Sequence, residues 1–267
     1  MIARALAACV AFACATAALA RAPAPVAATT EMGTLGGAAY RIDIPKDWNR
    51  NLVVFYHGYA VTPVAWTNDE RISPMFDGML RRGFAVIQSA YSATGWAVAE
   101  GAADTERLRK AFIAKHGAPK QTLLSGMSMG GTLTAMTIES RPDVYAGALS
   151  LCGALEPSDR LMQRDFALRA AFDHYFPNVL GALVPAPGDF MPTGDVIAKV
   201  KAAMRANPAA TRALLSWYGA GDADSLPDVI VFNTFEVREV QQRVHGNPFG
   251  NADLIYTNSG DDFALNA

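Results

Sequence analysis

Ser128 lies in the middle of Gly126-Met127-Ser128-Met129-Gly130, a Gly-x-Ser-x-Gly pattern. A serine hydroxyl is an effective nucleophile only when it is exposed, aligned with a base and placed beside donors for the developing oxyanion. The two glycines favour exposure, because they let a strand and a helix meet at a sharp turn without Cβ clashes. We therefore predict that Ser128 is a catalytic nucleophile and that the backbone N–H of Met129 is an oxyanion donor. A structural glycine turn with an incidental serine is the alternative.

A second candidate segment, His57-Gly58, follows the apolar run Leu52–Tyr56. A loop in this place carries the other oxyanion donor in enzymes with such a serine. The backbone N–H of Tyr59 is the predicted donor, and that of Ala60 is the next choice. His57 precedes the nucleophile, which breaks the expected order of serine, acid and histidine. We therefore interpret His57 as a residue that shapes the loop by hydrogen bonding.

The elements that must position these residues alternate between strand-like and helix-like from about Thr34 to Ser150. Such alternation predicts an α/β fold with a mostly parallel sheet flanked by helices. The expected strands are 52–56, 84–87, 121–125 and 145–151. One expected helix begins at Ser73-Pro74. Two further helices are expected over 96–116 and 129–140.

The sequence pattern changes after Cys152. Pro- and Gly-rich stretches there separate segments with a helical pattern, at 158–175, 195–206 and 211–218. We expect a helical lid inserted after the sixth strand. The predicted organisation is a signal peptide at 1–20, the N-terminal part of a core at 21–153, a lid region at 154–250, and a last segment, 251–267, that returns toward the core or is a truncated end.

The first residues have the pattern of a secretory signal. Met1–Arg4 carries a positive charge, Ala5–Leu19 is almost wholly apolar, and Ala18-Leu19-Ala20 places small residues where a signal peptidase cleaves. A membrane anchor is disfavoured because the apolar run is shorter than the roughly 20 residues that span a bilayer. Lipidation at Cys9 is disfavoured because too little apolar sequence precedes it. We expect a secreted or periplasmic protein that has no membrane contact after signal cleavage.

The amino-acid composition limits the classes of partner that the protein is expected to bind. There are 23 Lys and Arg against 25 Asp and Glu, a formal net charge of −2, without the clustered basic residues that nucleic acid or an anionic membrane requires. The four histidines and Cys152 show no metal-ligand spacing, so we expect no metal and no cofactor. The expected partner is a small-molecule ester or a peptide substrate.

Three pieces of the sequence, Leu52–Tyr59, Tyr91-Ser92-Ala93-Thr94-Gly95-Trp96 and Leu124–Gly131, resemble secreted bacterial α/β-hydrolases of the serine esterase and prolyl-oligopeptidase-like branch. The resemblance covers roughly residues 40 to 153. It implies acyl transfer through a Ser-His-Asp/Glu triad without a cofactor. Only Ser128 and the two oxyanion positions, Tyr59 and Met129, map residue by residue. A carboxylic ester hydrolase is the leading expectation, and a serine peptidase or a non-catalytic binding protein of this fold are the alternatives.

The triad is where the sequence departs from this pattern, which places an acid after the seventh strand and a histidine after the eighth. Only His174 and His245 follow Ser128. One arrangement makes Val229–Phe232 the seventh strand, Glu236 the acid and His245 the base, but nine residues are too few for the intervening helix and strand. We expect instead that the chain is a fragment whose last strands, acid and histidine lie beyond residue 267.

Overall fold

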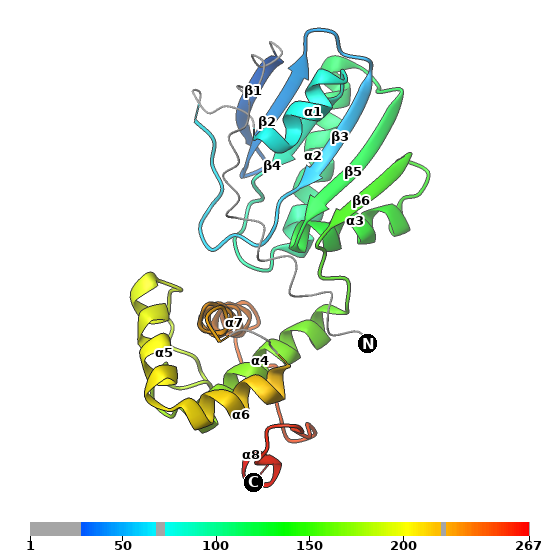
Figure 1. The fold of residues 1–267 in the computed structure, drawn as a ribbon. Coiled ribbons are helices and arrows are strands. Elements are labelled where there is room, and N and C mark those ends of the chain that lie inside the picture. Colours follow the sequence, from blue (N-terminus) through cyan, green and yellow to red (C-terminus); the bar gives the residue numbers. More distant parts are fainter. Residues whose placement is uncertain (1–27, 68–72, 220–222, 267) are drawn as a thin grey trace. The chain divides into compact units, whose positions relative to one another are not determined.

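The structure, a computed structural model, describes residues 28–67, 73–219 and 223–266 of the 267-residue chain (Figure 1). These residues fall into two compact units, a sheet unit up to Leu155 and a helical unit from Glu156 onward. The predicted signal peptide at 1–20 lies outside the described residues.

The sheet unit contains six strands in the order β1-β2-β4-β3-β5-β6. Strands β4, β3, β5 and β6 run parallel to one another. Strand β2 pairs antiparallel with β4, and β1 pairs antiparallel with β2. This arrangement confirms the expected α/β class with a mostly parallel sheet. The strands are β1 (Ala28–Leu35), β2 (Ala38–Pro45), β3 (Asn51–Tyr56), β4 (Ala85–Ser89), β5 (Gln121–Met127) and β6 (Gly147–Leu151).

Helices lie on both faces of this sheet: α1 (Pro74–Arg81) on one, and α2 (Val98–His116) and α3 (Met129–Ser140) on the other (Figure 1). Successive strand side chains point to opposite faces, so β3 contributes to both cores. Leu52 and Val54 pack in the core formed with α2 and α3, while Val53 packs with α1. A strand buried on both faces reads as a continuous apolar run, and that is why β3 is recognisable from sequence.

The hairpin β1–β2 is the part of the sheet that the sequence did not indicate. Its strands are joined by Gly36-Gly37, whose φ angles are 61° and 89°. A two-residue hairpin turn of this kind needs positive φ at both positions, which glycine adopts without strain. The sheet therefore begins at Ala28 and not near Thr34, as the alternation suggested.

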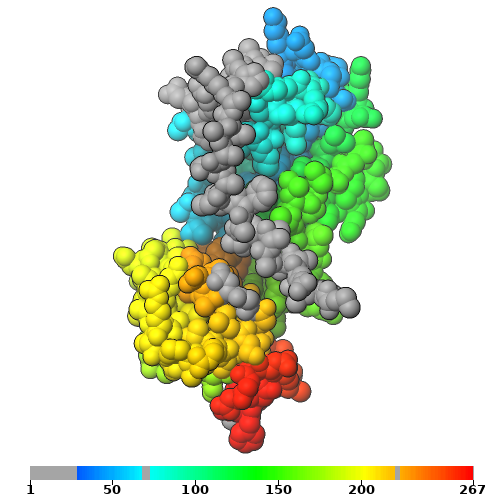
Figure 2. All heavy atoms as spheres, viewed as in Figure 1, coloured from blue at the N-terminus to red at the C-terminus, as the bar shows by residue number. Residues whose placement is uncertain are grey.

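Among the described residues of the sheet unit, no helix covers β5 and β6 on the side of α1. Helix α1 packs against β3 and β4, and atoms of the segment from β5 to β6 (green) are visible on the same face (Figure 2). On this side Met127 is 44% exposed and Leu149 is 56% exposed. Strand β6 is also the last strand of the sheet, so its outer backbone edge has no partner strand among the described residues.

The helical unit comprises α4 (Ser158–Tyr175), α5 (Gly194–Ala206), α6 (Pro208–Tyr218), α7 (Leu226–Arg243) and α8 (Asp262–Asn266). The first three confirm the expected helices nearly residue for residue. Its core joins α4, α5, α6 and α7 through Leu168, Phe172, Val200, Leu214 and Ile230. The segment 251–266 packs on this unit, where Tyr256 is buried in the same core.

The disfavoured arrangement that makes Val229–Phe232 a seventh strand is wrong, because these residues lie inside α7. In the described part of the chain after Glu156 the structure has no strand. No helix among the described residues combines the length and the apolar character needed to cross a bilayer.

Candidate active site

Ser128 occupies the turn between β5 and α3, with φ 56° and ψ −124°. Residues other than glycine rarely adopt a positive φ, and such strained conformations persist only where the surrounding structure enforces them. The Ser128 side chain is exposed, although the residues on both sides of it belong to regular elements. A strained strand-to-helix turn that lifts a serine hydroxyl to the end of the sheet is the geometry of a nucleophile elbow in an α/β-hydrolase.

The glycines of the pattern are required by contacts with other backbone. A Cβ at Gly126 would overlap the carbonyl of Gly130, and one at Gly130 would overlap the carbonyl oxygen of Tyr56. Strands β5 and β3 and helix α3 therefore approach one another more closely than any side chain allows. The sequence argument for the two glycines holds in the structure for a physical reason.

Hydrogen bonds of the backbone fix the turn. The amide N–H of Ser128 donates to the carbonyl of Leu151 at the end of β6, over 2.9 Å, and the carbonyl of Ser128 accepts from Gly131 over 2.8 Å. The first amides of a helix have no acceptor within the helix, and the helix dipole makes this end electropositive. The N–H of Met129, the first residue of α3, is therefore suited to bind an anionic oxygen, while the Met129 side chain is buried in the core.

The loop after β3 lies next to the serine. A Cβ on Gly58 would stand 3.2 Å from the Cβ of Ser128 and 3.8 Å from its Oγ. Glycine at this position keeps the space beside the hydroxyl open. The next residue, Tyr59, is the predicted second oxyanion donor, and Ala60 is tied to Gly95 by a backbone hydrogen bond of 2.9 Å.

His57 shapes this loop. Its Nδ1 lies 2.6 Å from the carbonyl oxygen of Gly58, and its ring stacks on that of Tyr91 with centroids 3.8 Å apart. Burial lowers the pKa of His57 below its usual value, so the ring is neutral at neutral pH and Nδ1–H donates to Gly58. The hydrogen-bonding role expected for His57 is present in the structure. Sequence reasoning missed Tyr91, for which the only signal was its place in one of the three resembling segments.

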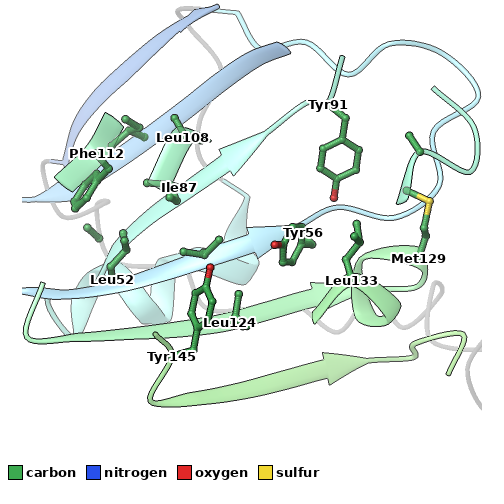
Figure 3. Close-up of a cluster of buried hydrophobic side chains, with 14 residues drawn as sticks. Leu52, Tyr56, Ile87, Tyr91, Leu108, Phe112, Leu124, Met129, Leu133 and Tyr145 are labelled. Carbon is green, nitrogen blue, oxygen red and sulfur yellow. The ribbon is translucent and has the colours of Figure 1, made fainter. Parts of the chain in front are cut away.

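Different side chains of the core lie at the two ends of the sheet, one near Ser128 and one opposite to it. Tyr91, Tyr56 and Met129 gather where β3 and β5 end, whereas Leu52, Phe112 and Tyr145 lie toward the strand starts (Figure 3). His116, at the C-terminal end of α2, is 3.3 Å from a carboxylate oxygen of Glu31 on β1. His116 therefore lies at the end of the sheet opposite to Ser128, because α2 leads from the end of β4 to the start of the parallel strand β5.

The structure does not bring Glu236 and His245 together as an acid and a base. Glu236 lies on α7 and His245 directly after this helix, nine positions later. At a rise of about 1.5 Å per residue the two lie roughly 13 Å apart along the axis, too far for a hydrogen bond. His174, on α4, is exposed and contacts the ring of Tyr175. Both histidines that follow Ser128 therefore belong to the helical unit.

Glu236 instead forms a buried carboxyl pair with Asp165, from α4. Burial, with the charge of Asp165, raises the pKa of Glu236 to about 9. Burial raises the pKa of Asp165 to about 6, against the opposing effect of Arg164. The side chain of Asn233 donates to Asp165 over 3.3 Å. Glu236 is thus protonated at neutral pH, whereas a triad acid must be ionised to hold its histidine.

The surroundings of the carboxyl pair contain further charged and titratable groups. Arg164 lies 3.9 Å from Asp165 and binds Glu156 at 2.6 Å. Glu239, on α7, contributes to the raised pKa of Glu236. Burial, with the charge of Asp165, raises the pKa of Tyr218 on α6. Among the described residues there is no group of three or more His, Cys, Asp or Glu side chains placed to hold a metal ion.

No protein-family model and no curated protein matches the sequence. Among solved structures, the chain is similar to the acetyl xylan esterase from Aspergillus awamori, with 21% identity over 45% of this chain and 50% of that one and a TM-score of 0.35. It is similar to the S-formylglutathione hydrolase from Staphylococcus aureus, with 15% identity, coverage of 52% and 61%, and a TM-score of 0.40. A post-proline cleaving enzyme from Rickettsia typhi has 16% identity, coverage of 52% and 22%, and a TM-score of 0.39. The alignments span less than two thirds of each of these three proteins.

Proposed function

We propose that this protein is a serine hydrolase that cleaves a carboxylic ester through an acyl-enzyme, with Ser128 as the nucleophile. The observation that carries the proposal is the backbone of Ser128, held at φ 56° and ψ −124° between β5 and α3 with its side chain exposed. Strain at an exposed nucleophilic residue is a known feature of active sites. The glycine contacts around Ser128 give this conformation its structural basis.

The proposed reaction has two steps, acylation and deacylation of Ser128. The Oγ of Ser128 attacks the acyl carbon while a base takes its proton, and the carbonyl oxygen becomes an oxyanion that accepts hydrogen bonds from the amides of Met129 and Tyr59. The C–O bond to the alcohol then breaks, and the alcohol leaves with the proton from the base. Water attacks the acyl-enzyme in the same way, which releases the carboxylic acid and returns the proton to Ser128.

The base is the part of the site that the sheet unit does not identify. A serine of this kind is normally served by a histidine that follows it in the chain. His174 and His245 are the two in this sequence. Substituting each by alanine tests them separately: a loss of turnover by about three powers of ten would identify the base. Unchanged turnover in both variants would show that neither histidine is the base.

The test of the function is hydrolysis of short p-nitrophenyl esters and of a peptide p-nitroanilide by the wild type and by Ser128→Ala. We expect ester hydrolysis that the substitution abolishes while circular dichroism stays the same. Cleavage of the peptide alone would indicate a serine peptidase. Activity that survives in Ser128→Ala would contradict the assignment of the nucleophile.

We also propose that the protein is exported by the N-terminal segment 1–20. The support is the order of a positive charge, an apolar run and small residues before Arg21. Mass spectrometry of the product from a host with export machinery should find a mature N-terminus at or near Arg21. Retention of Met1 would contradict export by a cleaved signal.

A further inference from the structure

We propose that Tyr91 is a positioning residue that clamps the loop 57–60 beside Ser128, so that the backbone of this loop is preorganised to receive the oxyanion. This inference rests on the proposed function. Tyr91 follows β4, and its ring and its hydroxyl hold the same residue, His57.

The two contacts are of different kinds. The rings of Tyr91 and His57 are stacked, with an interplanar angle of 20° and centroids 3.8 Å apart. The hydroxyl of Tyr91 donates to the backbone carbonyl of His57 over 3.0 Å. The hydroxyl points toward the end of β3, the strand that leads into the loop (Figure 3). Together the two contacts fix both the side chain and the backbone of the residue just before Gly58.

Tyr91 is itself held rigidly. Its side chain is only 5% exposed, and its φ is 58°, which a bulky residue adopts only under constraint. Its backbone N–H donates to the hydroxyl of Ser89 over 3.2 Å. On α2, a Cβ at Gly101 would come within 3.2 Å of the Tyr91 ring, so the helix backbone packs directly against it.

Burial raises the pKa of Tyr91 well above its ordinary value. The phenol therefore keeps its proton throughout the pH range of ester hydrolysis, and it remains a donor to the His57 carbonyl. A second tie lies further along the same loops, where the amide of Gly95 donates to the carbonyl of Ala60 over 2.9 Å. Gly58 and Tyr59 lie between these two contacts, and the amide of Tyr59 is the proposed oxyanion donor.

A clamp of this kind acts on the transition state more than on substrate binding. The negative charge develops only as Ser128 attacks, and a donor that is displaced by a fraction of an ångström stabilises it poorly. The substrate in its ground state needs this alignment less. Loss of the clamp should therefore lower kcat and leave KM almost unchanged.

The experiment compares Tyr91→Phe with Tyr145→Phe in the full chain. Tyr91→Phe keeps the ring stack and removes only the hydroxyl donor. Tyr145 is a matched control, because it is a buried tyrosine of the same core whose hydroxyl donates to Glu106 at the far end of the sheet (Figure 3). We expect Tyr91→Phe to lower kcat for a p-nitrophenyl ester about tenfold with KM within a factor of two, and Tyr145→Phe to change neither.

Hydrogen exchange of the segment 57–60 is the second readout. We expect faster amide exchange there in Tyr91→Phe than in the wild type or in Tyr145→Phe. If Tyr91→Phe matches Tyr145→Phe in kcat and in exchange, the clamp is overturned while activity that depends on Ser128 still supports the hydrolase. If the wild type hydrolyses no ester or peptide, the proposed function fails, and the catalytic role of Tyr91 fails with it.

Discussion

Gly58 and Ser128 face each other across the end of the sheet, so closely that a Cβ on Gly58 would lie 3.2 Å from the Cβ of Ser128 and 3.2 Å from the carbonyl oxygen of Met127. The two residues are 70 positions apart in the chain. Their approach brings the loop after β3 to the strained turn after β5, and it is the relationship on which the proposed oxyanion hole depends.

Gly58→Ala should therefore lower activity while leaving the fold intact. The added methyl group enters the space beside the hydroxyl, and its neighbours must shift by a few tenths of an ångström. We expect esterase turnover to fall by about tenfold or more, since small displacements at a reacting centre are costly. Gly147→Ala is the control, because its Cβ would make an ordinary contact of 3.6 Å with Leu123. Equal activity in the two variants would show that Gly58 does not border the reacting centre.

Gly130→Ala should instead destabilise the sheet unit. The new Cβ overlaps backbone carbonyls at the end of β3, and backbone has little freedom to move away. We expect a loss of about 3 kcal/mol or more in the free energy of unfolding, measured by urea titration. Gly194→Ala, where a Cβ would meet nothing within 4 Å, is the control. A Gly130→Ala variant of wild-type stability would mean that the close packing of the elbow is not present.

The stability of the helical unit should depend on pH through Glu236. Its pKa is about 9 in the folded protein against an ordinary 4.5, so unfolding releases a proton between these values. The free energy of unfolding must then fall as the pH rises through this window, by up to about 1.4 kcal/mol per pH unit. Asp165, with a pKa raised from 3.8 to about 6, adds to the fall in the lower part of the window.

The measurement is urea unfolding at pH 5, 7 and 9, followed by the fluorescence of Trp217, the single tryptophan of this unit, in a protein whose other three tryptophans are replaced by phenylalanine. Glu236→Gln should reduce the pH dependence markedly. Asp228→Asn is the control, since Asp228 lies on the same helix with its side chain 54% exposed. Stability that rises from pH 5 to pH 9 in the wild type would contradict the buried, protonated state of Glu236.

The outer edge of β6 should promote self-association. Charged residues and prolines keep the edges of sheets from pairing with other chains. The strand Gly147-Ala148-Leu149-Ser150-Leu151 contains neither. We expect Leu149→Lys to reduce the aggregated fraction in size-exclusion chromatography with light scattering. Met136→Lys, on α3 at a similar exposure of 49%, should have a smaller effect because a helix offers no free backbone edge. A monomeric wild type, or equal effects of both variants, would argue against edge pairing.

Much of the fold was predictable because local signals agree with the tertiary structure. The helices α3 and α4 match the expected 129–140 and 158–175, and a proline lies just outside one end of each, Pro142 after α3 and Pro157 before α4. Ser128 was predictable because its glycine spacing expresses a backbone constraint. The interpretation of Val229–Phe232 as a strand was wrong, since a short apolar run fits a buried helix as well as a strand. Pro227, in the first turn of α7, is the signal that favours the helix.

The remaining features depend on pairings between distant segments. Nothing local in the sequence indicates that Asp165 meets Glu236, or that the phenol of Tyr91 reaches the carbonyl of His57. The antiparallel hairpin β1–β2 joins the sheet through β4, and this order is a property of the assembled sheet. Such features follow from packing, and only the coordinates define them.

Labelling with a fluorophosphonate probe, followed by peptide mass spectrometry, tests the central claim most directly, because it requires an activated serine but no knowledge of the substrate. We expect a single adduct on Ser128 in the wild type and no adduct in Ser128→Ala, with both proteins equally folded by circular dichroism. An adduct on another serine, or labelling that persists in Ser128→Ala, would contradict it.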